Sequence, residues 1–209
     1  MIHRTARRFF VPLAIAAASL LIVRAPADAE PKDEVAIFAG GCYWTVEAIF
    51  EHVKGVESAV SGLATPAADS GLTWTRAPRL TSLAEAVQVR YDPGKVSYEE
   101  LLEAFFRAAH DPTQLDRQGP DRGPRYRSIV FVETEAQAAT VRAFIDSLGK
   151  SGLYKRPIVT EVLRLDKFKE VPDDQQDFVA KNPRHPYVLV HDRPKLVSLE
   201  RNFAHLYSD

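Results

Sequence analysis

The order in which strand-like and helix-like patterns follow one another constrains the fold of this chain more than any other feature. Two helical patterns, which begin near Trp44 and at Ser97, separate segments that read as strands. These strand segments are Val35–Ala39, Gly55–Gly62, Glu85–Tyr91 and Tyr126–Val132. The resulting order is β-α-β-β-α-β, the split βαβ arrangement. We therefore expect an α/β (α+β) fold, a ferredoxin-like two-layer sandwich with a mixed sheet.

Capping signals place the ends of the later elements. Ser97 and Glu100 form the sequence of a capping box, and the helix that they open should stop at His110-Asp111-Pro112. Three additional C-terminal elements follow: a helix from Thr134 to Gly149, a strand at Ile158–Leu165 and a short closing helix at Lys195–Phe203.

The N-terminus has the pattern of an export signal. Basic residues precede the apolar run VPLAIAAASLLIV, which is shorter than a membrane-spanning helix, and Ala27-Asp28-Ala29 has the small-x-small form of a cleavage site. We predict a signal peptide at residues 1–29, one domain at 30–209, and a periplasmic or secreted protein. The pair Arg7-Arg8 resembles a twin-arginine signal. An uncleaved anchor is the alternative.

Composition and charge exclude some classes of partner. The chain has 209 residues, of which 45% are hydrophobic, and its formal net charge is -1. With no basic run in the part that should fold, neither nucleic acid nor an anionic membrane is expected to bind. We expect a monomer.

Cys42 is the only cysteine, and it lies in the stretch AGGCYWTVE at the predicted junction of a strand and a helix. A single cysteine cannot form an internal disulfide, so Cys42 is either a small buried hydrophobe or a reactive thiol. The free N–H groups and the dipole at a helix start favour a thiolate. We therefore expect the pKa of Cys42 to be lowered.

Glu85 is the second candidate for chemistry. In the alternating strand EAVQVRY it falls on the same face as Val87 and Val89. A carboxyl group turned toward an apolar face is costly unless it is protonated or has a partner. Together Cys42 and Glu85 indicate nucleophilic attack assisted by an acid. No feature pairs a histidine with Cys42 as in a cysteine protease, and a zinc site lacks cysteine partners.

A collinear series of motifs over roughly Val35 to Lys195 resembles the A-type peptide methionine sulfoxide reductases. In order, the motifs are GCYW followed by Glu47, AEAVQVRYDP, SYEELLEAFF, HDPT, RQGPDRGPRYRS and KNPRHPY. The resemblance implies an α/β sandwich that reduces the S epimer of methionine sulfoxide, free or in proteins, through a cysteine sulfenic acid.

The resemblance also implies a role for individual residues. Cys42 would be the nucleophile and Glu85 the acid that protonates the sulfoxide oxygen. Polar groups that orient the oxygen or a water would be Asp121 and Tyr126. The substrate pocket would be formed by Tyr43, where the family usually has phenylalanine, with Trp44 and Tyr187.

The chain departs from the family pattern in three places. SGLATP and Thr73-Trp74 replace a GYxGG turn and a tyrosine, and Gln175 replaces a histidine. The resolving cysteines that many members carry are absent. We therefore expect no bound cofactor or metal, and regeneration by an external thiol, either a small thiol or a thioredoxin-like or glutaredoxin-like protein.

Two other functions stay open from the sequence. An exported thiol-based peroxidase or redox sensor would use the same cysteine on peroxides. Alternatively, a domain derived from the family would bind methionine-containing peptides without turnover.

Overall fold

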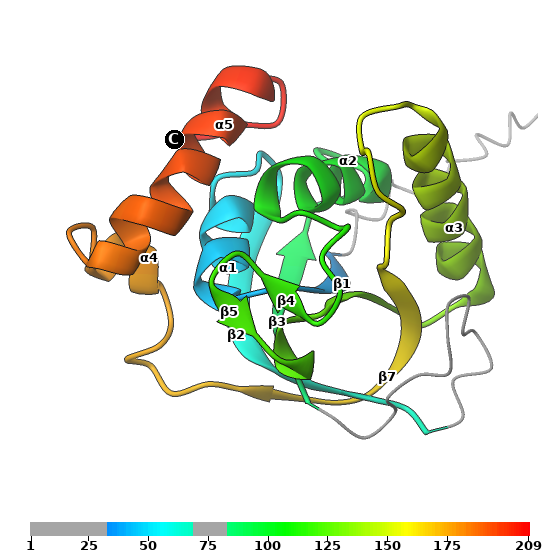
Figure 1. Ribbon diagram of the computed structural model, residues 1–209, viewed down its shortest axis with the longest axis horizontal. Coiled ribbons are helices and arrows are strands. Elements are labelled where there is room, and N and C mark those ends of the chain that lie inside the picture. The colour runs from blue at the N-terminus through cyan, green and yellow to red at the C-terminus, as the bar shows by residue number, and fades with distance from the viewer. Residues whose placement is uncertain (1–32, 69–82) are drawn as a thin grey trace, which may run out of the picture. The chain divides into compact units, whose positions relative to one another are not determined.

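The computed structural model describes residues 33–68 and 83–209 (Figure 1). The predicted signal peptide at residues 1–29 and the Thr73-Trp74 segment lie outside these described residues. No helix in the described ranges combines the length and the apolar character that crossing a membrane requires.

Strands and helices follow one another as the sequence pattern predicts, with additions at the C-terminal end (Figure 1). The strands are β1 (Glu34–Gly40), β2 (Val56–Pro66), β3 (Ala84–Tyr91), β4 (Arg117–Gln118), β5 (Asp121–Arg122), β6 (Ser128–Val132) and β7 (Glu161–Glu170). The α-helices are α1 (Tyr43–Glu51), α2 (Tyr98–Ala104), α3 (Glu135–Lys150), α4 (Phe178–Lys181) and α5 (Arg193–Asn202). Shorter turns of other helical types are Phe105–Ala109, Pro124–Tyr126 and Val188–Asp192.

Five strands form one mixed sheet in the order β1-β3-β2-β7-β6, which closes because β6 also pairs with β1. The β6–β7 pair is parallel and the other pairs are antiparallel. Strands β4 and β5 form a separate two-stranded hairpin. The expected α/β class with a mixed sheet is confirmed.

The two faces of the sheet bury different side chains. Small residues such as Ala39 and Ala86 pack on one face with Ile129 and Phe131, because the inside of a small closed sheet has little room. The other face carries Phe38 and the strand β3 valines against the apolar sides of the helices. Phe38 is fully buried and stacks between Phe50 of α1 and Phe105. This helix-covered face includes the side of β3 on which Glu85 was expected.

Capping boxes at Ser97 and Thr134 are present as predicted. The helix that Ser97 opens ends in the π-helical turn Phe105–Ala109, directly before His110. The closing helix is also present.

Several predicted boundaries were wrong. Strands β2 and β7 run on to Pro66 and Glu170, past the predicted ends at Gly62 and Leu165. Gly149 does not end α3, which continues to Lys150. Tyr126 lies in a 3-10 turn begun by Pro124, so β6 starts only at Ser128. Strand β7 starts at Glu161 rather than Ile158, where it comes into register with Ile129 of β6.

Candidate active site

Cys42 is the N-cap residue of α1, at the junction where β1 ends. Gly41 before it has a φ of 100°, which favours glycine, and a Cβ there would meet the Gln118 side chain at 2.5 Å. A Cβ on Gly40 would lie 2.8 Å from the Phe105 ring. The two glycines therefore let the chain turn under the loop that carries Gln118 and bring the thiol to its position.

The surroundings of Cys42 disfavour its charged form. The backbone N–H of Trp44 in the first turn of α1 lowers the pKa of the thiol, as expected of a helix start. Burial, however, is the largest influence, and with the charges of Glu85, Asp192 and Asp121 it raises the pKa well above the ordinary value. The prediction of a lowered pKa is therefore wrong for the substrate-free protein, because burial and nearby acids outweigh the dipole.

Glu85 reaches the start of α1 from β3. Its side chain is 7% exposed, and one carboxylate oxygen accepts the N–H of Tyr43 at 3.3 Å. The other oxygen lies 3.4 Å from the Arg125 guanidinium, and the Tyr126 hydroxyl also contacts the carboxylate. Burial raises the pKa of Glu85 despite these three partners. A carboxyl group whose pKa is raised by burial thus lies beside the residue after Cys42.

Asp121 and Tyr187 meet although they are far apart in sequence. Asp121 lies in the β4–β5 hairpin, and its carboxylate accepts a hydrogen bond from the Tyr187 hydroxyl. Burial is the main reason why the pKa of Tyr187 is raised, followed by the charge of Cys42 and the bond to Asp121. Burial, Glu85 and Asp121 likewise raise the pKa of Tyr126. The structure thus gathers around Cys42 the three polar residues that the sequence suggested.

Trp44 and Tyr43 supply aromatic surface next to the thiol. The Trp44 ring stacks on Phe178 of α4, with centroids 3.6 Å apart and planes 6° from parallel. Tyr187 meets the same ring edge-on at 5.9 Å. The Tyr43 hydroxyl donates a hydrogen bond to the Gln175 side-chain oxygen at 3.5 Å. Residues from the C-terminal third of the chain therefore contact both aromatic side chains and keep them in place.

A small cavity of about 60 Å³ lies beside Cys42. Sequence reasoning missed four of the residues that line it: Thr45, Gln118, His191 and Lys195. The Thr45 hydroxyl donates a hydrogen bond to the carboxylate of Asp192. Asp192 is fully buried and lies 147 residues later in the chain. The only sequence signal was a pair of opposite charges, Asp192 and Lys195, at helical spacing before an apolar stripe.

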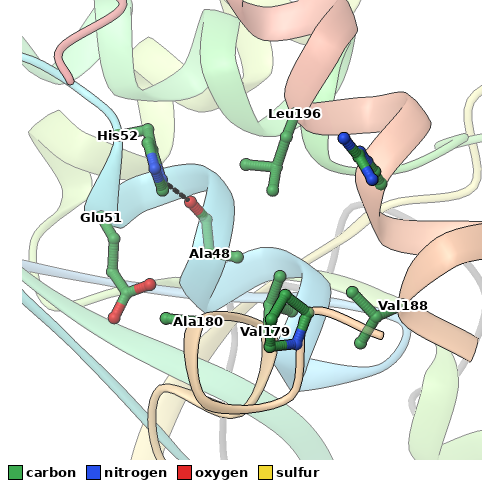
Figure 2. Close-up of a pocket in the computed structure, with 9 residues that line it drawn as sticks. Ala48, Glu51, His52, Val179, Ala180, Val188 and Leu196 are labelled. Atoms are coloured by element: carbon green, nitrogen blue, oxygen red, sulfur yellow. Dashed lines mark hydrogen bonds between the residues drawn. The ribbon is translucent and has the colours of Figure 1, made fainter. Parts of the chain in front are cut away.

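A larger cavity of about 330 Å³ lies toward the C-terminal end of α1 (Figure 2). Apolar side chains of α1, α4 and α5, among them Val179 and Leu196, line it, and a His52 ring nitrogen lies 2.8 Å from the Ala48 carbonyl oxygen. None of the residues predicted for the active site lies in its lining.

Glu47, which follows the GCYW motif, has a structural position. Its buried carboxylate accepts the N–H of Ser61 at 3.2 Å and that of Asp177 at 3.0 Å. It therefore ties β2 and the start of α4 to α1. Within residues 33–68 and 83–209, histidine, cysteine and acidic side chains form no group of three that could hold a metal ion.

The chain is similar to known proteins of one family. A family model described as peptide methionine sulfoxide reductase matches residues 34–206. A protein of Mesorhizobium japonicum named peptide methionine sulfoxide reductase MsrA 2 is 45% identical over 181 residues, which are 87% of this chain and 93% of the relative. A Synechocystis protein of the same name is 46% identical over 177 residues, 84% of this chain and 80% of the relative.

Solved structures show the same fold. Methionine sulfoxide reductase A of Corynebacterium diphtheriae superposes with a TM-score of 0.58 at 29% identity, over 74% of this chain and 77% of its own. Mxr1 of Saccharomyces cerevisiae in reduced form superposes with a TM-score of 0.60 at 26% identity, over 74% of this chain and 88% of its own.

Proposed function

Because the chain belongs to the peptide methionine sulfoxide reductase family and is an enzyme of its A type, we propose that it reduces methionine (S)-sulfoxide with Cys42 as nucleophile. The substrate is methionine sulfoxide, free or within proteins. The observation that carries the proposal is the position of Glu85, whose carboxylate binds the backbone N–H of the residue next to Cys42.

Bonds are made and broken in the chemical step by these two side chains and the substrate. The Cys42 thiolate, whose proton has passed to solvent, attacks the sulfoxide sulfur and forms a transient sulfur–sulfur bond while the Glu85 carboxyl proton passes to the sulfoxide oxygen. The hydroxyl group then moves to Cys42 sulfur as the transient sulfur–sulfur bond and the bond between oxygen and the substrate sulfur both break. Methionine leaves with its sulfur reduced by two electrons, and Cys42 becomes a sulfenic acid, oxidised by two.

The groups around the thiol account for orientation of the substrate. Trp44, held by Phe178, and Tyr43 provide apolar faces for the substrate methyl group. On the polar side, Asp121 and Tyr187 are already bonded to each other, and Tyr126 lies beside Glu85. The hydroxyl groups can donate hydrogen bonds to the sulfoxide oxygen, and the Asp121 carboxylate can accept hydrogen bonds from a water.

Regeneration requires a thiol from outside the chain, because Cys42 is its only cysteine. An external thiol attacks the sulfenic sulfur and releases water, which leaves a mixed disulfide that a second thiol opens. The reductant is a small thiol or a thioredoxin-like or glutaredoxin-like protein. The sequence pattern of residues 1–29 further supports export of this enzyme, with its reductant in the same compartment.

Incubation of the reduced protein with each epimer of a methionine sulfoxide peptide, and separately with hydrogen peroxide, tests the proposal. Without reductant we expect one methionine per protein from the S epimer only, and a Cys42 sulfenic acid that a specific reagent traps. Peroxide consumption without sulfoxide reduction would instead indicate a peroxidase or redox sensor. Binding without product would indicate a peptide-binding domain.

A further inference from the structure

The proposed nucleophile lies in surroundings that oppose its ionisation. Acidic side chains reach Cys42 from three parts of the chain: Glu85 on β3, Asp121 on β5 and Asp192 before α5. Burial adds to their effect. Since the thiolate is the reactive form of cysteine, a positive charge near the sulfur would favour attack at neutral pH.

Lys195 is the cation that shares a cavity with the thiol. Its side chain extends from α5 and lines the cavity of about 60 Å³ beside Cys42, together with Tyr187 and Gln118. Helix α5 lies beside α1 (Figure 1), so that a side chain from the end of the sequence reaches the first turn of α1. Arg125, the guanidinium nearest to Glu85, is instead half exposed and paired with that carboxylate.

Asp192 and Thr45 fix the segment that carries Lys195. Asp192 is fully buried and accepts a hydrogen bond from the hydroxyl of Thr45, which lies three residues after Cys42. Its second oxygen has no hydrogen-bond partner among the described residues. Asp192 and Lys195 are one helical turn apart, so the carboxylate lies on the same side of the segment as the ammonium.

We propose that the Lys195 ammonium stabilises the Cys42 thiolate across their shared cavity, and that Thr45 and Asp192 position it. In this step the S–H bond breaks and the proton passes through cavity water to solvent, with no change in oxidation state. The proposal rests on the function proposed above, in which Cys42 is the nucleophile.

Neighbouring charges at Lys195 oppose the effect of its burial. Burial is the largest influence and lowers the pKa of Lys195 overall, whereas the charges of Asp192, Cys42 and Asp121 act in the opposite direction and favour the ammonium. Titratable groups that face the thiol or the ammonium are Tyr43 from α1, Glu85 from β3, Asp121 from β5, Tyr126, Tyr187, His110, His191 and Asp192. Among the lysines and arginines in the described part of the chain, Lys195 is the one that lines the cavity with Cys42.

The test is the pH dependence of Cys42 alkylation by iodoacetamide, which needs no sulfoxide. Lys195→Met should move the midpoint upward by at least about one pH unit and slow alkylation at pH 7.5 about tenfold, because one unit is a tenfold change in thiolate fraction. Lys195→Arg, which keeps the charge, should stay within about threefold of the parent protein. Arg193→Met is the matched control, since Arg193 belongs to the same helix but lines the other cavity.

Several outcomes would overturn the proposal. A pH profile of alkylation that does not shift in Lys195→Met would show that the charge of Lys195 has no effect on the thiol. An equal shift in Lys195→Arg or in Arg193→Met would show that the shift has another cause than this charge. If Lys195→Met fails to fold by circular dichroism, Lys195→Gln is judged by the same criterion. The function proposed above fails separately, when the parent protein reduces neither sulfoxide epimer although its alkylation profile responds to Lys195 as expected.

Discussion

The hydroxyl of Tyr187 donates a hydrogen bond to the carboxylate of Asp121, which is 66 residues earlier in the chain. This bond joins the β4–β5 hairpin to the segment that leads into α5. Asp121 raises the pKa of Cys42, and the charge of Cys42 raises the pKa of Tyr187, so the hydrogen-bonded pair forms one polar side of the surroundings of Cys42.

Removing either side chain of the Asp121–Tyr187 pair should lower activity about as much as removing both. Tyr187→Phe and Asp121→Asn each remove the bond, and each should lower kcat/KM for the S epimer about tenfold, the loss expected for roughly 1.4 kcal/mol of transition-state stabilisation. The double variant should be little worse than either single one, because coupled residues are not additive. Steady-state kinetics of the four proteins check this. Fully additive losses would show that the two side chains act independently.

Cys42→Ser should abolish sulfoxide reduction without loss of the fold. The hydroxyl group is nearly the size of the thiol, yet it is a far poorer nucleophile at neutral pH. Cys42 makes no side-chain capping bond at the start of α1, so the helix does not depend on its sulfur. Turnover assays and thermal unfolding measure the two effects, and substantial turnover by this variant would end the mechanism.

Glu85→Gln should lower kcat by about 10²–10⁴, the usual contribution of a general acid. The amide keeps the shape of the side chain and an oxygen for the Tyr43 N–H, but it has no acidic proton. Glu99→Gln, a change at an exposed position of α2, is the matched control and should be neutral. A loss smaller than about threefold would move the acid role elsewhere, with Tyr126 next to be tested.

His110 should make the protein less stable as the pH falls from 6.5 to 4. The buried ring is held as neutral imidazole between the Phe105 carbonyl and the Ser128 hydroxyl, and burial lowers its pKa from 6.5 to about 4. The unfolded chain binds the proton first in this range, so protonation favours unfolding by up to about 3 kcal/mol.

Urea unfolding of the parent protein and of His110→Gln across this pH range isolates the effect. The parent should lose stability relative to the variant as the pH falls. Glu47, whose pKa burial raises to about 7, has the opposite pH dependence but is present in both proteins. Parallel stability curves would contradict the prediction.

Local patterns in the sequence predicted the fold well. The alternation of EAVQVRY placed Glu85 on the face of β3 that the helices cover, and the capping signals placed the starts of α2 and α3. Errors occurred where a local pattern competed with another: Pro124 imposes a 3-10 turn on a segment that looked like a strand. Pairing with β6, which no pattern within β7 reveals, sets the start of β7.

The candidate site was predicted only as far as motifs and short-range arguments reach. Cys42 and Glu85 stood out by their local positions, and their catalytic roles stay predictions. The positions of Lys195 beside Cys42 and of Asp192 beside Thr45 depend on contacts across about 150 residues, which the helical spacing of Asp192 and Lys195 does not reveal. The same limit explains the wrong expectation for the Cys42 pKa. The helix dipole is a local property, whereas the opposing acids come from β3, β5 and the segment before α5.

The bond between Thr45 and Asp192 has a consequence for how the protein is made. Synthesis proceeds from the N-terminus, so the ribosome completes Cys42 and Glu85 long before it adds Asp192 and Lys195. A nascent chain therefore carries an unpartnered thiol whose cavity, aromatic support and neighbouring cation are still missing. The contact of Thr45 with Asp192 and the cavity that Cys42 shares with Lys195 can therefore form only after synthesis has passed α5.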